Sequence, residues 1–191
     1  KVEGIPADWL SAPNRPISIV PGEKKQVLIT FNPPRSPESL AASYRVSANV
    51  ACQNRPAEYA VAGMLLSLSP YYQFSCAIDP AQLVSGQIGH IAIRNDGNST
   101  ENFAVGWSDP EQNLEFTPAR PVFAIPAGEE IAAEFRVAAA RPPLFGAGRR
   151  QPFGALVSSI MGLPQSLAGD LTVKGLIPTW VIPVLILACL V

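Results

Sequence analysis

The feature that most constrains this chain is a repeat of about 107 residues, in which one order of strands and turns occurs twice. Residues 17–31 and 122–137 each hold a short apolar strand, a turn with Pro, Gly and Glu, and a strand of alternating character. Aligning Gly22 with Gly128 sets the apolar positions of these second strands opposite each other. A proline-rich turn, another alternating strand and a last strand that ends in Pro follow in each copy. The repeat therefore predicts two β-sandwich domains in tandem.

Composition supports an all-β chain and excludes several function classes. The 191 residues include 20 prolines, which suit short strands and turns better than helices. Hydrophobic residues make up 48%, so the chain is not disordered. A net charge of -1 gives no basis for a nucleic-acid partner. A single His and three Cys exclude a multi-histidine metal centre.

Period-2 alternation predicts which side chains face the cores. In the first copy the inward positions are Val27, Ile29, Phe31, Tyr44, Val46, Ala48 and Val50, followed by Cys52. In the second copy they are Phe74, Cys76, Ile78, Ile91, Ile93, Phe103, Val105, Trp107, Ala133, Phe135, Val137, Phe153, Ala155 and Val157. The second copy holds about seven strands, the number in an immunoglobulin-like sandwich. We expect all of them to pair antiparallel.

Three segments follow from this pattern. Residues 1–69 are predicted to be the C-terminal part of one immunoglobulin-like sandwich, and residues 70–176 a complete one. The first copy begins midway through the repeat, so we expect its first two or three strands to lie ahead of Lys1 in a longer protein. Without them, the first sandwich would be incomplete and would have an open edge.

Residues 177–191 are predicted to be the start of a transmembrane helix. No charged residue follows Lys174, and Trp180 stands where an aromatic residue at the membrane interface belongs. This interpretation predicts a single-pass membrane protein with extracytoplasmic sandwiches. A buried terminal strand is the alternative.

The first copy contains G-I-P-x-x-W-L, P-G-E, V-x-I-x-F-x-P-P-R-S and Y-R-V-x-A-N-V, and the second contains I-A-I-R-N-D-G-N-S-T-E-N-F. This pattern resembles the Ig-like domain associated with alpha-galactosidases, which recurs in tandem in predicted bacterial membrane proteins. The resemblance covers nearly the whole chain and implies a fold and a topology, but no catalytic residue. The sequence departs from it at Cys52, at Cys76 and in the long segment Pro142–Gln151.

No residue pattern predicts a catalytic, cofactor or metal site. His90 alternates with inward isoleucines and is expected to face solvent. Asp96 lies in N-D-G-N-S-T, which reads as a plain turn because the spacing of a calcium loop is absent. Trp9 and Trp107 are interpreted as core or interface aromatics.

A membrane-proximal interaction site is predicted in the loop Arg141–Gln151. Antiparallel pairing puts this loop at the end of the sandwich where the last strand finishes. Its basic and apolar side chains suit a lipid headgroup layer or a partner subunit, and an ordinary solvated loop stays open as the alternative. The predicted interaction residues are Arg141, Leu144, Phe145, Arg149, Arg150 and Trp180.

Three tyrosines are predicted to have structural roles. Tyr44 occupies the position of a tyrosine corner, so its hydroxyl is expected to bond to backbone a few residues upstream. Tyr71 and Tyr72 are expected to pack at the joint between the two sandwiches, near the turn Asn95–Thr100.

These features predict a non-enzymatic, membrane-anchored structural or accessory protein. Its sandwiches would act as a spacer or as a docking surface in a larger membrane complex. The expected partners are other membrane-protein subunits, surface proteins, and lipid through the C-terminal helix, with no nucleic acid and no cofactor. The alternatives are a carbohydrate-binding accessory module of a cell-surface glycosidase and a protein whose catalytic domain lies elsewhere.

Overall fold

The fold is all-β, as the sequence predicts. The structure is a computed structural model and describes residues 1–13, 15–144, 148–175 and 181. The chain divides into two compact units, unit 1 (Lys1–Tyr71) and unit 2 (Tyr72–Val191).

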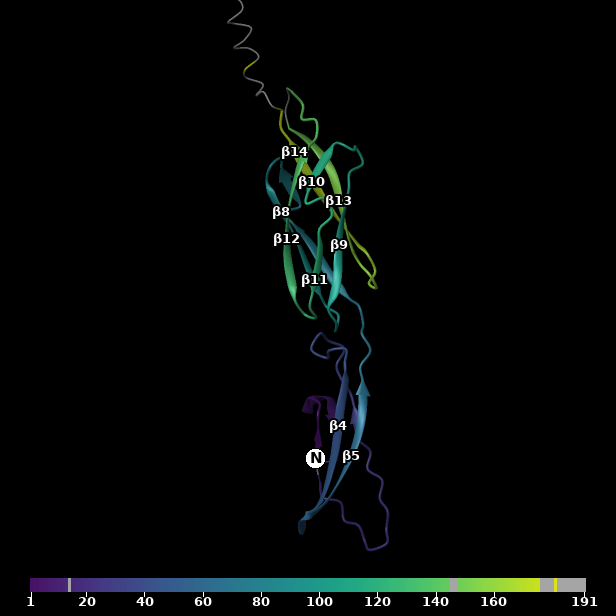
Figure 1. Cartoon of the computed structure of the whole chain (residues 1–191). Helices are drawn as coiled ribbons and strands as arrows, with labels where there is room; N and C mark the ends of the chain where they lie inside the picture. Colours follow the sequence, from purple (N-terminus) through teal and green to yellow (C-terminus); the bar gives the residue numbers. More distant parts are fainter. Residues whose placement is uncertain (14, 145–147, 176–180, 182–191) are drawn as a thin grey trace, which may run out of the picture. The chain divides into compact units, whose positions relative to one another are not determined.

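Unit 2 is a closed β-sandwich of two sheets (Figure 1). One sheet has the order β10-β12-β8-β6, and the other has the order β11-β9-β13-β14-β7. The strands are β6 (Phe74–Asp79), β7 (Gln82–Val84), β8 (Ile88–Asn95), β9 (Glu101–Ser108), β10 (Leu114–Thr117), β11 (Val122–Ile125), β12 (Glu130–Ala139), β13 (Arg149–Ser159) and β14 (Gln165–Val173).

The core of unit 2 is built from the inward positions that alternation predicts. β8 contributes Ile91 and Ile93, β9 contributes Phe103 and Val105, and all four are buried. Aromatic rings fill the space between the sheets. Phe135 packs against Trp107 at 4.7 Å between ring centroids and against Phe153 at 6.1 Å. Burial of these large side chains is the main term that stabilises the sandwich.

Two details of unit 2 differ from the prediction. Its described part has nine strands rather than about seven. The expectation that every pair is antiparallel is wrong at β7, which runs parallel to β14 with Leu83 opposite Leu171. Pro80 lies between β6 and β7 and has no amide hydrogen for the ladder. The β6 ladder therefore stops before Pro80, and the chain pairs with the opposite sheet beyond it.

Unit 1 has fewer strands than unit 2. Its main sheet has the order β1-β4-β5, and a small two-stranded sheet pairs β2 with β3. The strands are β1 (Val2–Glu3), β2 (Leu10–Ser11), β3 (Thr30–Phe31), β4 (Ser43–Cys52) and β5 (Arg55–Ser67), and the 3-10 helix η1 (Ala7–Trp9) precedes β2. Residues 16–29 alternate as a strand would, but they form no strand.

Several inward positions predicted for unit 1 are exposed. Trp9 and Val46 are buried, but Val27 is 47% exposed and Val50 is 68% exposed. Cys52, which the pattern predicts to be buried, is also exposed. The predicted burial is wrong at these positions: among the described residues of unit 1, the only sheet beside β1-β4-β5 is the two-stranded pair of β2 and β3.

Tyr44 forms the bond expected of a tyrosine corner. Its hydroxyl donates to the Leu40 carbonyl oxygen at 2.9 Å, four residues upstream. Its ring meets the Trp9 ring edge-on at 5.4 Å between centroids. The bond therefore fixes the connection that leads into β4.

The Tyr44→Phe variant should lower the free energy of unfolding of unit 1 by about 1 kcal/mol, because it removes this one hydrogen bond and keeps the ring. Urea unfolding followed by Trp9 fluorescence measures the change. Tyr59→Phe is the matched control, since Tyr59 is exposed on β5, and it should change stability by less than about 0.5 kcal/mol. Equal stability of the Tyr44→Phe variant and the parent chain would contradict the role of the bond.

The predicted membrane location is wrong. In the described part of the chain, no helix is long and apolar enough to cross a bilayer. The run on which the prediction rested holds 15 residues, fewer than the about 20 that a spanning helix needs. That run, 177–191 with Trp180, lies outside the described residues except for Val181. The single-pass location, its sidedness and a lipid contact through a C-terminal helix are therefore unsupported.

Candidate functional site

The candidate site is the end of unit 2 at which β13 begins and β14 ends, together with the loop that precedes β13. Antiparallel pairing sets Arg149 opposite Val173 and Arg150 opposite Thr172. Lys174 follows at once, and Gly148 lies against its side chain. We call this surface the basic pole, made of Arg141, Leu144, Arg149, Arg150 and Lys174. The predicted contact residue Phe145 lies outside the described residues.

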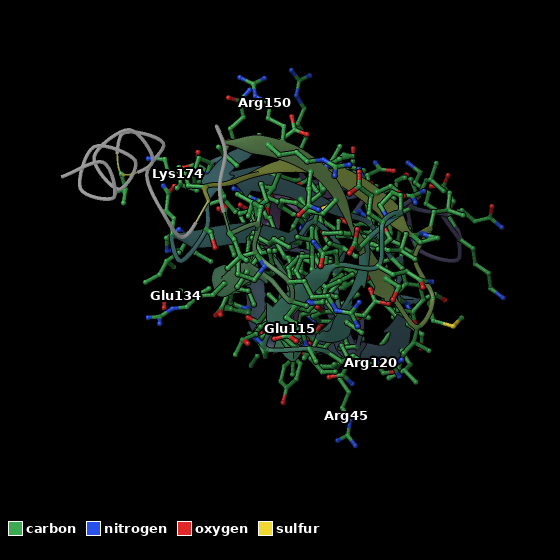
Figure 2. All side chains as sticks on the ribbon, turned by 90° about the horizontal axis from the view of Figure 1, so that it is seen from above. Arg45, Glu115, Arg120, Glu134, Arg150 and Lys174 are labelled. Carbon is green, nitrogen blue, oxygen red and sulfur yellow. The ribbon has the colours of Figure 1, made fainter. Side chains whose placement is uncertain are left out.

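Glu111 anchors one side of the basic pole. Its Oε1 accepts a hydrogen bond from the Arg149 guanidinium at 2.9 Å, and its Oε2 accepts one from Gln151 Nε2 at 3.1 Å. Because Gln151 is buried, its bond to Glu111 helps to hold this end of unit 2 together. Arg149 is thus partly neutralised, whereas Arg150 and Lys174 are exposed, and the Arg150 side chain extends away from the ribbon (Figure 2).

The turn beside the basic pole is held by Asp109. Its Oδ1 accepts a bond from the Glu111 amide at 3.0 Å, and its Oδ2 accepts one from the Leu114 amide at 2.7 Å. On the other side, Asn113 Oδ1 accepts a bond from the Arg141 amide at 3.2 Å. Because both Asp109 oxygens bind backbone amides, this carboxylate stabilises the turn and the base of the loop.

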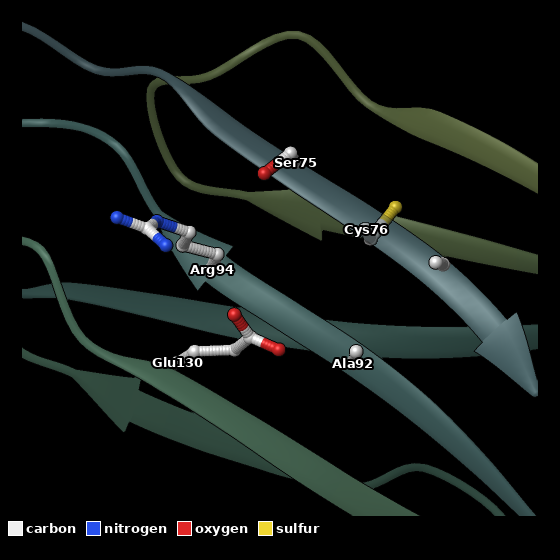
Figure 3. Close-up of a pocket in the computed structure, with 6 residues that line it drawn as sticks. Ser75, Cys76, Ala92, Arg94 and Glu130 are labelled. Carbon is white, nitrogen blue, oxygen red and sulfur yellow. The ribbon is translucent and has the colours of Figure 1, made fainter.

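A shallow hollow lies on the outer face of the sheet that contains β6, β8 and β12 (Figure 3). Small side chains at Ala77 and Ala92 form its floor, and Arg94 and Glu130 flank it as cross-strand partners. The guanidinium at its edge is paired with a neighbouring turn, since Arg94 Nε lies 3.1 Å from an Asp96 carboxylate oxygen. The hollow is therefore an ordinary outer sheet surface.

The thiol at the edge of this hollow is not an activated nucleophile. Cys76 is half-buried, and its Sγ lies 3.3 Å from Gln165 Oε1, to which it donates. Burial raises the pKa of the Cys76 thiol. A raised pKa keeps the thiol protonated at neutral pH, and the thiolate is the reactive form.

The remaining side chains that could take part in catalysis or metal binding also form no reactive site in the described part of the chain. His90 is opposite Glu134 across the β8–β12 ladder, with 3.8 Å between Nε2 and Oε1, on a half-exposed surface. Among the residues that the structure describes, no group of three or more His, Cys, Asp or Glu side chains could hold a metal ion.

The tryptophans form no sugar-binding platform in the described part of the chain. Trp107 stacks on Phe116 at 4.7 Å with 4° between the rings, and its indole nitrogen donates to the Pro118 carbonyl oxygen at 3.0 Å. Trp9 is buried in unit 1. Both side chains have the core role that the sequence predicts, so neither offers a free ring face for stacking on a sugar.

Tyr71 has a partner inside unit 1. The Arg35 guanidinium carbon lies 4.8 Å from the centroid of its ring, which is a cation–π geometry. The predicted packing of Tyr71 and Tyr72 at the joint between the sandwiches stays a prediction.

Asn95, which no sequence pattern marks, holds three segments together through its side chain. Asn95 is fully buried, and its Nδ2 donates to the carbonyl oxygens of Ser99 at 2.8 Å and Ile125 at 2.9 Å. Its Oδ1 accepts a bond from the Gly97 amide at 3.0 Å. The sequence N-D-G predicts a turn here. The Asn95 side chain is buried only because β11 lies against this turn.

Comparison with known proteins assigns no family to this chain. No family model matches it, and no curated protein matches it. Among solved structures, it is similar to the periplasmic chaperone SfaE, with a TM-score of 0.38, 17% identity and coverage of 55% of this chain and 60% of that one. The E. coli chaperone DraB gives 0.36, 14%, 54% and 56%. The complex of the Salmonella enterica SafA pilin with the SafB chaperone gives 0.37, 11%, 54% and 55%.

These structural similarities assign no function to this chain. It spans between 55% and 60% of the length of the three structures.

Proposed function

We propose that this chain is a non-enzymatic structural module that docks another protein through the basic pole of unit 2. The observation that carries the proposal is the set of basic residues at this end of unit 2: Arg149, Arg150 and Lys174 lie at the paired ends of β13 and β14, and Arg141 lies at the base of the loop before β13. The closed core of unit 2 holds this surface in a fixed arrangement. An acidic protein surface is the partner that complements it, since opposite charge steers association and sets orientation.

Apolar contact would strengthen binding beyond the attraction between opposite charges. Leu144 is 62% exposed in the loop before β13, where it is free to be covered by a partner. A rim of Arg with an apolar residue is a common composition of protein interfaces. On the basis of the sequence pattern, we propose that the module is of the same type as the tandem Ig-like domains associated with alpha-galactosidases.

The double variant Arg149→Glu with Arg150→Glu tests this proposal. A tagged chain is expressed in its native cells, cross-linked, and the co-purified partner is quantified at about 0.05 M and about 0.3 M salt. Reversal of two charges should reduce the retained partner about tenfold at low salt, which corresponds to about 1.4 kcal/mol. The difference between the variant and the parent chain should shrink at the higher salt concentration because exposed charges are screened.

The double variant Arg120→Glu with Arg136→Glu is the matched control. Both arginines are exposed on unit 2 outside the basic pole, so the net charge changes equally. Retention should stay at the level of the parent chain in this control. Equal loss in both double variants, or no loss in either, would contradict docking through the basic pole.

A further inference from the structure

The outer faces of the two sheets of unit 2 differ in charge. On the sheet β10-β12-β8-β6, the outward positions of β8 and β12 include Arg94, Glu130 and Arg136, and Arg94 lies opposite Glu130. On the sheet β11-β9-β13-β14-β7, residues 102–108 and 151–169 contain no charged side chain. The second sheet therefore has a neutral outer surface along β9 and along most of β13 and β14.

The same sheet carries most of the large apolar side chains that are exposed in the described part of unit 2. On its strands or in its β13–β14 hairpin lie Val84, Val122, Leu156, Ile160, Met161 and Leu163. Single apolar residues scattered over a surface are ordinary, but an exposed apolar cluster on an uncharged sheet marks an interaction site.

The strand register shows which of the outward residues are neighbours. Val122 of β11 lies opposite Ala104 of β9. Leu156 of β13 lies between Gly106 of β9 and Ser166 of β14. Alternate residues of a strand share a face, so the side chains next along the same strands complete this surface. We call it the neutral face, made of Ala104, Gly106, Val122, Leu156, Ser166 and Ala168.

The β13–β14 hairpin continues the neutral face beyond the end of β13. Its backbone is held in place, because the Met161 amide donates to Glu101 Oε1 at 3.2 Å and the Gly162 amide donates to Ser159 Oγ at 2.7 Å. Three apolar side chains are nevertheless exposed here, up to 86% at Leu163. A fixed backbone loses little conformational entropy on binding. We call these side chains the apolar tip, made of Ile160, Met161 and Leu163.

The lack of charge favours a second copy of the chain as the occupant of the neutral face. A dimer with two-fold symmetry sets a surface patch against the same patch of its partner, so a charge near the axis meets a like charge. The neutral face has no charge that could repel itself. A charged partner surface, by contrast, would lose hydration here and find no opposite charge.

The relief of the neutral face also suits a second copy. Leu156 is 45% exposed and stands between the smaller residues Gly106 and Ser166 of the two adjacent strands. The face thus has a central projection with a low position on each side. A half-turn about an axis beside Leu156 brings the projection of each copy over the low position at Gly106 of the other.

The size of the surface is sufficient for a weak dimer. Four strands spaced about 4.8 Å apart, each with about six residues at about 3.3 Å, span about 400 Å². Two such faces together with two apolar tips reach the about 1,000 Å² that a specific interface needs. We therefore expect a dissociation constant on the order of 10 µM, since interfaces of this size are at the weak end of the specific range.

We propose that two copies of this chain associate through the neutral face of unit 2. The two sheets pack about 10 Å apart, as stacked sheets do. Leu156 of each copy lies beside the two-fold axis, and the apolar tips lie at the rim. This inference does not rest on docking through the basic pole.

Sedimentation velocity of the full chain at about 1–200 µM tests the proposal, because this range brackets the expected dissociation constant. The parent chain should show a monomer–dimer equilibrium. Leu156→Lys sets two like charges beside the axis and should weaken association at least about tenfold. Ala132→Lys is the matched control, since Ala132 is exposed on β12 in the other sheet, and it should associate as the parent chain does.

A charge exchange shows whether the contact is symmetric about residue 156. Leu156→Glu should also lose the dimer when it is alone. An equimolar mixture of Leu156→Lys and Leu156→Glu should regain it at about 0.05 M salt and less so at about 0.3 M salt. A parent chain that stays monomeric overturns the proposal. So does equal association of Leu156→Lys and Ala132→Lys, or a mixture that does not associate.

A second variant covers the case in which the Leu156 variants misfold, which loss of hydrogen-exchange protection along β13 would reveal. Val122 lies on the edge strand β11 and is 63% exposed, so Val122→Lys should fold as the parent chain does. It should weaken association at least about threefold, because it adds like charges within the interface. Association of Val122→Lys at the level of the parent chain would also overturn the proposal.

Discussion

Replacement of Phe135 by alanine should lower the free energy of unfolding of unit 2 by about 3–5 kcal/mol. Phe135 is 2% exposed and lies between the two sheets, where it contacts Trp107 and Phe153. Truncation removes apolar burial and leaves a cavity that neighbouring rings fill only partly. Urea unfolding, followed through hydrogen exchange of the β8 amides, measures this loss because β8 pairs directly with β12.

The matched control lies at an inward position of the other copy. Val27 corresponds to Ala133 of β12, but it is half-exposed in unit 1. Val27→Ala should change the stability of unit 1 by less than about 1 kcal/mol, since little area leaves water there on folding. A cost for Val27→Ala equal to that of Phe135→Ala would contradict the exposed position of Val27 in unit 1.

Alternation predicted the core of unit 2 well because every pairing partner is present in the chain. Ile91, Ile93, Phe103 and Val105 follow a period of two and are all buried. The same pattern failed at Val50 because alternation states only which side chains share a face of a strand. Whether that face is covered depends on a second sheet, and this is a non-local property.

The details that escaped prediction are also non-local. The parallel pairing of β7 with β14 joins segments almost ninety residues apart, as Leu83 and Leu171 show. The basic loop could be located beside the end of β14 from antiparallel pairing alone. Its ion pair with Glu111 could not, because the pair spans 38 residues and no motif marks it.

The membrane prediction failed for a different reason. It rested on the apolar composition of residues 177–191, and composition gives hydrophobicity but no secondary structure. The run holds 15 residues, fewer than the about 20 that a spanning helix needs.

Replacement of Asn95 by leucine should lower the free energy of unfolding of unit 2 by about 3 kcal/mol or more. Leucine has a similar branched shape and is not smaller, so the change removes hydrogen bonds without opening a cavity. The carbonyl oxygens of Ser99 and Ile125 and the amide of Gly97 would lose their partner. Each buried polar group left unsatisfied costs about 1–3 kcal/mol.

Asn102→Leu separates this effect from a general effect of an apolar residue near the turn. Asn102 lies on β9, where it is exposed and pairs with Ala124. Its replacement should change stability by less than about 0.5 kcal/mol. The Asn95→Leu variant should also lose protection against hydrogen exchange at the Gly97 amide and at the β11–β9 ladder, because Asn95 joins the turn to β11. If the stability loss occurred without loss of protection at these amides, the cost would come from packing, and the role assigned to the three hydrogen bonds would be wrong.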